Sequence, residues 1–200
     1  MSQASQTERQ IWSQFQRGDR AAFSHIYHTY YKDLYRYGYK ITADSDLTRD
    51  YIQAFFLYLW ERRESLRALD TIRYYLIKAF RRHVFRAMEK ETRFGQDAGM
   101  TETAAIVFSP EEVLTDQETE SERNGYITQL LNSLSPRQRE IIYLRYYEEM
   151  SPGEIAEVLS INYQSVINHL HQALYRMKDR SHKVIWPLIG LFIPLMNLFL

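Results

Sequence analysis

The residues best suited to chemistry lie on the outward side of a predicted helix that begins near Asn162. Amides, a hydroxyl, an imidazole and a guanidinium gather there, and such groups hydrogen-bond to base edges or hold phosphates. We therefore expect contacts with DNA from this side of the helix. Bases or grooves are expected to meet Gln164, Ser165, Asn168 and His169, with Gln172 beside them, and a phosphate is expected to meet Arg176.

Two short amphipathic helices would position these side chains. Ser151 and Pro152, followed by Glu154, form the pattern of a capped helix start. About three residues, Ser160 to Asn162, separate this helix from the next. Helices so joined form a helix-turn-helix, whose second helix can enter a major groove; the alternative is an ordinary helical hairpin. The predicted inward residues are Ile155, Ala156, Val158 and Leu159 on the first helix and Val166, Leu170, Ala173, Leu174 and Met177 on the second.

The composition predicts an all-α chain. It has 200 residues, 45% of them hydrophobic, with only seven glycines and five prolines, and no stretch alternates polar and apolar residues as a strand does. Helical spacing predicts three or four helices in the first half, including 47–65 and 72–93. We expect two small helical domains, 8–94 and 118–182, joined by a flexible acidic linker, 95–117, and followed by an apolar tail, 183–200.

Charge is distributed unevenly although the formal net charge is zero. Between Arg73 and Arg93 there are seven basic residues and only two acidic ones, whereas 94–122 holds acidic residues and neither lysine nor arginine. A basic block can keep a local positive patch when an acidic block cancels the sum. Tyr74 adds a ring on which an unstacked base could lie. The basic residues of this block that could contact phosphates are Arg73, Lys78, Arg81, Arg82 and Arg86.

Several function classes lack their sequence signals. The absence of cysteine excludes disulfides and thiolate metal sites. The six histidines form no carboxylate–histidine metal motif, and neither a phosphate-cradling glycine loop nor a nucleophile elbow is found. We expect neither an enzyme, nor a metal, nor a cofactor. The first residues lack a signal-peptide pattern, so a cytoplasmic location is expected.

The end of the chain is unusually apolar. Val184–Leu200 holds seventeen residues without a charge, interrupted by Pro187, Pro194 and Asn197. A membrane-spanning helix needs about 20 apolar residues. Three interpretations stay open: a membrane anchor, an interfacial segment, or a tail that packs on this protein or on a partner.

The two halves together resemble a known family. Asp50–Glu61, with the pattern of an acid, an apolar pair, Gln, Phe and Trp, resembles a polymerase-binding helix, and Tyr75–Arg82 resembles the helix that follows it. In the second half the matching motifs are Leu134-Ser135-Pro136-x-x-Arg139, Glu154-Ile155-Ala156, Ser165-Val166 and Ala173. From about residue 15 to residue 180 the chain resembles a bacterial RNA polymerase sigma factor of the extracytoplasmic-function group, the short kind with two domains.

The resemblance implies roles for three sets of residues. Core RNA polymerase would bind Asp50, Gln53, Phe56, Leu57, Trp60 and Glu61. The minus-ten promoter element would meet Arg73, Tyr74, Lys78, Arg81, Arg82 and Arg86, and the minus-thirty-five element would meet the outward residues of the second helix-turn-helix helix. It also implies an anti-sigma factor as a partner. The alternatives are a helix-turn-helix regulator that acts without polymerase, and a membrane-tethered interaction protein that uses Val184–Leu200.

Overall fold

The computed structural model describes residues 3–69, 71–93, 106–108 and 121–181. Within these ranges every regular element is a helix, which confirms the all-α prediction. The first group is α1 (Gln3–Gln16), α2 (Arg20–Thr42), α3 (Ser45–Arg62), the short 3-10 helix η1 (Arg63–Ser65) and α4 (Ile72–Arg93). The second is α5 (Ser121–Asn132), α6 (Pro136–Tyr146), α7 (Pro152–Leu159) and α8 (Tyr163–Ser181).

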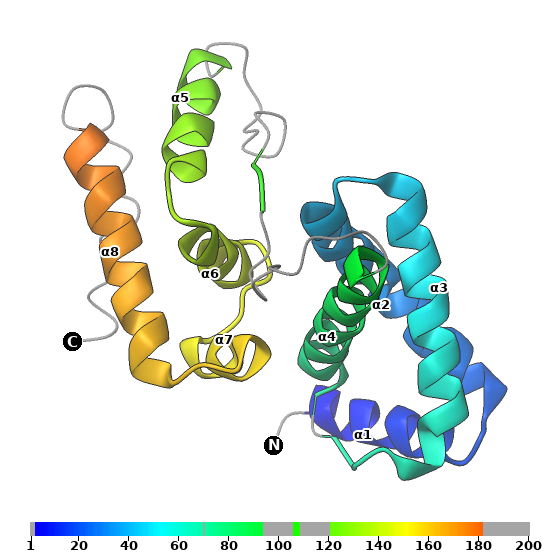
Figure 1. Cartoon of the computed structure of the whole chain (residues 1–200). Helices are drawn as coiled ribbons and strands as arrows, with labels where there is room; N and C mark the ends of the chain where they lie inside the picture. Colours follow the sequence, from blue (N-terminus) through cyan, green and yellow to red (C-terminus); the bar gives the residue numbers. More distant parts are fainter. Residues whose placement is uncertain (1–2, 70, 94–105, 109–120, 182–200) are drawn as a thin grey trace.

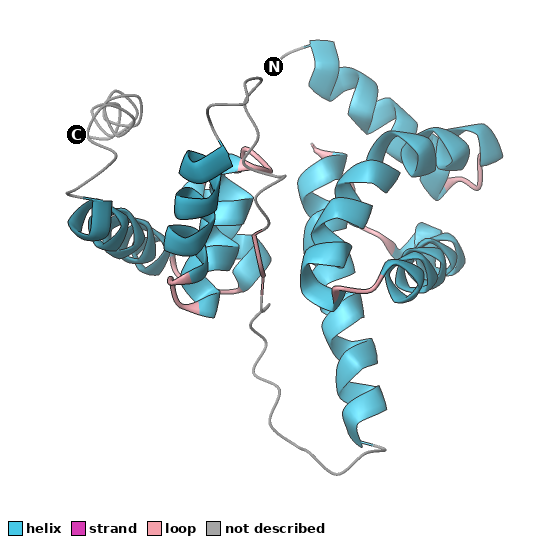
Figure 2. Ribbon diagram, turned by 90° about the horizontal axis from the view of Figure 1, so that it is seen from above, coloured by secondary structure: helices cyan, strands magenta, loops and turns pink. Residues whose placement is uncertain are grey.

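The two groups lie side by side, each as a bundle of helices (Figures 1 and 2). We call α1–α4 the first domain and α5–α8 the second domain. They meet where α4 packs against α7, and one continuous cluster of buried hydrophobic residues runs from Trp12 in α1 to Ala173 in α8. The two cores are therefore joined across the contact between the domains.

Local capping explains where the helices of the first domain begin. The Asp19 carboxylate accepts hydrogen bonds from the N–H groups of Ala21 and Ala22 at the start of α2. Asp44 does the same at the start of α3, which begins at Ser45, two residues before the start predicted for the 47–65 helix. Such bonds satisfy N–H groups that have no partner inside the helix.

The start of α4 depends on another helix. The Ile72 N–H donates to the Glu8 carboxylate on α1, with 2.8 Å between N and Oε2. The same carboxylate accepts a bond from the Tyr30 hydroxyl at 3.0 Å. A side chain distant in the sequence thus fixes the position of α4 relative to α1 and α2.

Aromatic packing fills the first domain. Trp12 and Phe15 of α1 lie with their ring centroids 5.0 Å apart, and Phe55 of α3 lies 5.3 Å from Phe80 of α4. All four are nearly inaccessible to solvent. At Gly38 of α2, a Cβ would lie 2.9 Å from the Thr48 side chain, so α2 and α3 approach too closely there for a larger residue.

The second domain contains the predicted helix-turn-helix. Ser135 begins α6 and Ser151 begins α7, each in a reciprocal capping box with the residue three positions on. Ser160, in the left-handed conformation at φ 54°, ends α7. The turn leads directly into α8, whose Val166 and Ala173 are fully buried. The predictions of a capped start at Ser151 and of this inward face are confirmed.

Part of the predicted flexible linker is packed against both domains. Ile106 and Phe108 are almost completely buried, and Asn132 of α5 holds the Phe108 backbone through bonds to its N–H and its carbonyl, at 3.0 and 2.9 Å. Lys40 of α2 donates to the Val107 carbonyl at 2.7 Å. The prediction of flexibility is therefore wrong for these three residues, because the side chains of Ile106 and Phe108 are buried and the backbone of Val107 and Phe108 is hydrogen-bonded, although the Val107 side chain is exposed.

The predicted apolar tail, Val184–Leu200, lies outside the described residues. Among the residues that are described, no helix combines the length and the apolar character needed to cross a membrane.

Candidate nucleic-acid interface

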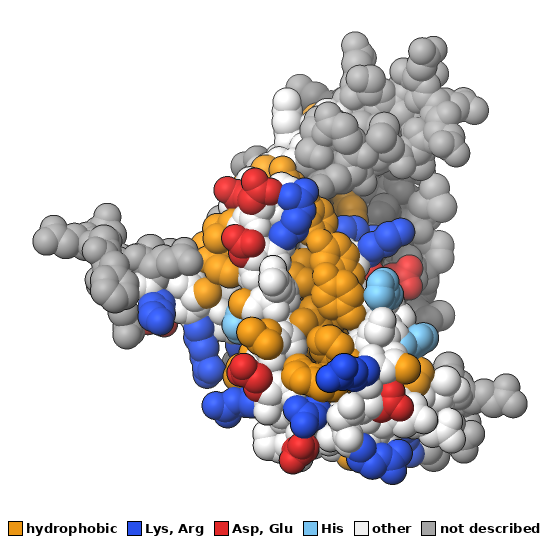
Figure 3. Space-filling model, turned by 90° about the vertical axis from the view of Figure 1, so that its right-hand side faces the viewer, with side chains coloured by type: hydrophobic (Ala, Val, Ile, Leu, Met, Phe, Trp, Pro, Cys, Tyr) orange, Lys and Arg blue, Asp and Glu red, His pale blue; other side chains and the backbone are white. Residues whose placement is uncertain are grey.

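One side of α3 is exposed and mixed in character. Asp50, Gln53, Leu57 and Glu61 are all exposed there, and Leu57 keeps 58% of its surface accessible. Figure 3 looks onto the side of the molecule that α3 occupies in Figure 1 and shows hydrophobic side chains gathered between scattered charges. These four of the six predicted polymerase contacts are available to a partner.

The other two predicted polymerase contacts, Phe56 and Trp60, are less accessible to a partner. Phe56 is buried, 3% exposed, with its ring centroid 4.7 Å from that of Tyr27. Trp60 is half-buried against Phe23, and the Arg63 guanidinium lies over its ring at 4.7 Å. Phe56 is therefore a core residue and not a surface anchor, because the buried face of α3 includes both Phe55 and Phe56.

The basic helix α4 faces the second domain. Arg73 donates from Nη1 to the Glu148 carbonyl at 2.6 Å and from Nη2 to the Glu148 carboxylate, while its Nε reaches Asp33 at 2.7 Å. Tyr74 donates its hydroxyl to the Glu157 carboxylate, which Lys78 also meets at 3.2 Å. Three predicted DNA contacts thus have carboxylate partners from α7 and from the loop before it.

The cations further along α4 differ in their burial. Arg81 is nearly inaccessible, and its Nε donates to Glu140 of α6 at 2.9 Å. Arg82 is exposed and reaches the Ser160 hydroxyl at 3.3 Å, and Arg86 is exposed. In this conformation the prediction that Arg81 meets DNA is wrong, because its guanidinium lies between the domains, paired with a buried carboxylate.

These contacts shift the ionisation of the groups involved. Burial raises the pKa of Glu148, although the Tyr143 hydroxyl and Arg73 oppose that shift. The hydrogen bond from Tyr74, followed by that from Lys78, lowers the pKa of the exposed Glu157. Burial and the bond to Glu157 raise the pKa of Tyr74. At neutral pH the Glu157 site therefore pairs a carboxylate with a neutral phenol, and Lys78 lies 3.2 Å from the same carboxylate.

The acidic partners are the residues that the sequence analysis missed. Glu140 and Glu148 are completely buried, which is rare for carboxylates unless they are paired. Glu140 also accepts bonds from the Tyr37 hydroxyl at 3.0 Å and from Arg137 at 3.4 Å. Its neighbours Ile141 and Ile142 are buried as well, so an acid inside an apolar run was the signal that could have identified it.

The predicted recognition residues lie along α8. Gln164, Asn168 and Gln172 are exposed, and Ser165 is partly exposed. The Gln164 amide donates to the Asn168 side chain at 3.1 Å, and the Ser165 N–H donates to Asn162, which caps the helix, at 2.7 Å. Two adjacent amides are therefore held in a fixed relation on an open surface, as base-edge recognition requires.

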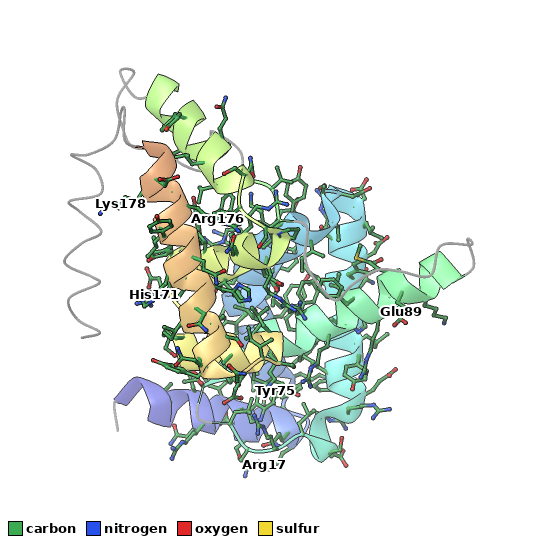
Figure 4. The ribbon with its side chains drawn as sticks, turned by 60° about the vertical axis from the view of Figure 1, so that its left-hand side comes forward. Arg17, Tyr75, Glu89, His171, Arg176 and Lys178 are labelled. Atoms are coloured by element: carbon green, nitrogen blue, oxygen red, sulfur yellow. The ribbon has the colours of Figure 1, made fainter. Side chains whose placement is uncertain are left out.

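His169 and Arg176 are tied more closely to the body of the domain. Burial lowers the pKa of His169, which favours the neutral imidazole, and its Nδ1 has no partner among the described residues. Arg176 is exposed but donates to Gln138 of α6 at 3.1 Å. In Figure 4, Arg176 turns toward α6, while His171 and Lys178 lie on the other side of α8. A DNA phosphate would therefore have to compete with the Gln138 side-chain amide for the Arg176 guanidinium.

No group of three or more histidine, aspartate or glutamate side chains within the described ranges is arranged to hold an ion.

Comparison with known proteins agrees with this geometry. Residues 124–177, which contain α6, α7 and most of α8, match the family described as sigma-70, region 4. The chain is 23% identical over 174 residues to the ECF RNA polymerase sigma factor SigK of Mycobacterium ulcerans (strain Agy99), covering 83% of this chain and 89% of that protein. It is 26% identical over 172 residues to the RNA polymerase sigma factor YlaC of Bacillus subtilis (strain 168), covering 82% and 94%.

Two solved structures have a similar fold. CnrH, in complex with the cytosolic domain of CnrY, matches with a TM-score of 0.57 and 17% identity over 86% of this chain and 94% of that one. The sigma factor RpoE of Bartonella quintana, in complex with the anti-sigma factor NepR, matches with a TM-score of 0.55 and 18% identity over 78% and 94%. The region 4 match, the relatives that span both domains and the shared helical fold together support an RNA polymerase sigma factor of the extracytoplasmic-function group.

Proposed function

We propose that three separate surfaces divide the work of promoter-specific initiation. The exposed side of α3 binds core RNA polymerase, α4 holds the opened minus-ten strand, and α8 reads the minus-thirty-five element. The observation that carries the proposal is that three chemically different surfaces lie on three different helices: mixed on α3, basic and aromatic on α4, and rich in amides on α8.

The surface on α3 suits a protein partner. Leu57 offers an exposed apolar anchor, and Asp50 and Glu61 flank it with negative charge. Interfaces of this kind concentrate binding energy in a few central side chains, while charges at the rim guide association. A basic and apolar surface on core polymerase would complement it.

The surfaces on α4 and α8 suit two forms of DNA. Arginine and lysine beside Tyr74 provide phosphate contacts and a stacking ring, the combination that binds single strands. On α8, Gln164 and Asn168 present amides, which match adenine edges in a major groove. The chain therefore contacts both a melted and a duplex element.

Core binding is the first test. Leu57→Ala should weaken binding of the full-length chain to purified core polymerase by at least about fivefold, the effect of losing an interface anchor. Tyr175→Ala is the matched control, because Tyr175 is also an exposed apolar residue, at 71%, but lies on α8. Equal affinities for the two variants would refute the assignment of the α3 surface.

Transcription is the second test. Core polymerase with this chain, on a genomic DNA library, should give discrete new start sites that share two upstream elements. Asn168→Ala should change the base preference in the upstream element only, and Arg82→Ala should slow promoter opening. Specific duplex binding without any new start sites would instead favour a regulator that acts without polymerase.

An anti-sigma factor is the expected inhibitor. The solved structures of similar fold hold CnrH with CnrY and RpoE with NepR. We extend this to the present chain: a protein of that kind would compete with core polymerase, and co-expression with it should abolish the new starts.

A further inference from the structure

A buried amide lies directly behind the DNA-facing side of α8. Gln138, in the first turn of α6, is only 2% exposed. Its Oε1 accepts a hydrogen bond from Nη1 of Arg176 at 3.1 Å, and its Nε2 donates to Oε1 of Gln172 at 3.4 Å. Both of these partners are exposed on α8. A core residue of α6 therefore contacts two of the side chains that would meet the minus-thirty-five element.

The chemistry of its partners fixes the orientation of the Gln138 amide. The backbone N–H of Ser135 also donates to Oε1 of Gln138, with 3.2 Å between N and O. A guanidinium and a backbone N–H can donate but cannot accept, so the atom that they meet must be the carbonyl oxygen of the amide. Rotating the amide by 180° would lose both bonds. The NH2 group of Gln138 is therefore held toward Gln172.

The fixed amide of Gln138 determines the polarity of Gln172. An N–H group needs an acceptor, and the acceptor of a glutamine side chain is its carbonyl oxygen. With Oε1 of Gln172 turned to Gln138, its Nε2 has no hydrogen-bond partner among the described residues. The Gln172 side chain is exposed. It therefore presents hydrogen-bond donors to a ligand of α8, while its acceptor is engaged inside the protein.

The other amide pair on α8 is not fixed in this way. Gln164 donates from Nε2 to Oδ1 of Asn168 at 3.1 Å, and both side chains are exposed. Within the described part of the chain no third group bonds to either side-chain amide, so both can rotate together and reverse the bond. Each can therefore offer a donor and an acceptor, as the bidentate recognition of adenine requires. Gln172 differs because its polarity is set before DNA binds.

We propose that Gln138 is a positioning residue for base recognition, which makes Gln172 recognise hydrogen-bond acceptors. In the major groove guanine presents the acceptors O6 and N7 and thymine presents O4, whereas cytosine presents an amino donor. The base that meets Gln172 should therefore be guanine or thymine, and cytosine should be rejected. This inference rests on the proposed role of α8, and it adds the class of base that one position of the upstream element must carry.

A randomised promoter tests the polarity of Gln172. Start sites obtained with core polymerase from the genomic library define the upstream element. A library of one such promoter, with this element randomised and each template carrying a transcribed barcode, is then transcribed by the same complex. At one position guanine or thymine should exceed cytosine by about threefold to tenfold, the effect of one net hydrogen bond, and Gln172→Ala should abolish this preference at that position alone. A preference for cytosine there, or a Gln172→Ala variant that changes no position, would overturn the proposal.

The role of Gln138 is tested by Gln138→Glu. Glutamate also closes a capping box, and its carboxylate can still accept from Ser135 and Arg176, but it has no N–H to donate. Gln172 should then turn its NH2 group inward and present its oxygen to DNA. The preferred base at this position should change to one with an amino donor, cytosine or adenine. A variant that unfolds in urea like the natural chain but keeps the natural base preference would refute the positioning role.

Two further variants make the test independent of a buried charge. Gln172→Glu leaves Gln138 intact and offers only acceptors at an exposed site, so it should favour cytosine at the same position. Gln164→Glu, an equal change of charge on the exposed side of α8, is the matched control and should leave the base preference at that position unchanged. If all three glutamate variants weaken transcription from every sequence alike, repulsion from DNA explains the result and the proposal fails.

The outcomes separate this inference from the proposed function. Discrete start sites with an unaltered base preference in folded Gln138→Glu would leave the role in initiation standing and refute the positioning. If no start sites appear, the proposed function fails. Selection of randomised DNA duplexes by the full-length chain alone then gives the same comparison of Gln138→Glu with Gln164→Glu, and equal base preferences in that selection would refute the positioning as well.

Discussion

The buried pair between Arg81 and Glu140 should be the most costly polar contact to break. Arg81→Met would leave the Glu140 carboxylate inaccessible to water and without its main cation. Removing one partner of a buried ion pair costs about 3–5 kcal/mol. Glu140 would keep its bonds from Tyr37 at 3.0 Å and from Arg137 at 3.4 Å. We therefore expect Arg81→Met to lower the free energy of unfolding by about 3 kcal/mol, the lower end of that range.

Urea-induced unfolding of the full chain, followed by circular dichroism, measures this loss. Arg86→Met is the matched control, because it makes the same change at an exposed site on the same helix and should alter the free energy of unfolding by about 0.5 kcal/mol or less. The double variant Arg81→Met with Glu140→Gln should recover at least about 1 kcal/mol, since the stranded charge is gone and an amide can still accept from Tyr37.

Two results would refute the reasoning. A loss below about 1 kcal/mol for Arg81→Met would mean that water reaches Glu140 when the arginine is removed. A double variant no more stable than the single one would mean that the cost came from lost packing of the long arginine side chain rather than from the unpaired carboxylate.

Three further predictions concern stability. Phe108→Ala should cost about 3–5 kcal/mol of unfolding free energy, because a fully buried ring is lost, whereas the exposed Val107→Ala should cost little; equal losses in denaturant titrations would contradict the packing of this segment. Ser151→Ala should cost about 1 kcal/mol by removing the cap of α7, and an unchanged urea midpoint would argue against that cap. Burial lowers the pKa of His83 and of His169, so the folded chain favours the neutral form of both imidazoles. The free energy of unfolding that depends on this difference is present above the unfolded-state pKa of about 6.5, and it is lost as pH falls from there through the folded-state pKa. His83→Gln should therefore weaken, without abolishing, the loss of stability between pH 7.5 and pH 5.5 in thermal melts, and an identical pH dependence would refute the assignment.

Local signals explain why several helix boundaries could be predicted. The starts of α6 and α7 depend on a serine, a proline and a polar residue three positions later, all within one turn. The apolar spacing of α8 likewise identified the buried Val166 and Ala173. Such features are decided by residues close in the sequence, so the sequence alone contains them.

Nonlocal contacts explain the errors. The burial of Arg81 depends on Glu140, fifty-nine positions away, and nothing near Arg81 distinguishes it from the exposed Arg82. Phe56 lies between Phe55 and Leu57, and three successive apolar residues cannot be divided between core and surface by periodicity. Ile106 and Phe108 form no periodic pattern, and Phe108 is held by residues distant in the sequence, Asn132 and Tyr143.

The pairing of the two domains changes how the cations of α4 should be interpreted. A substitution such as Lys78→Ala removes a proposed DNA contact, but it also removes a contact that holds the domains together. The first effect weakens DNA binding by the proposed α4 surface, whereas the second lowers the free energy that holds the two domains together. Because the same side chain serves both contacts, an effect of Lys78→Ala on initiation does not by itself measure the DNA contact of the proposed α4 surface.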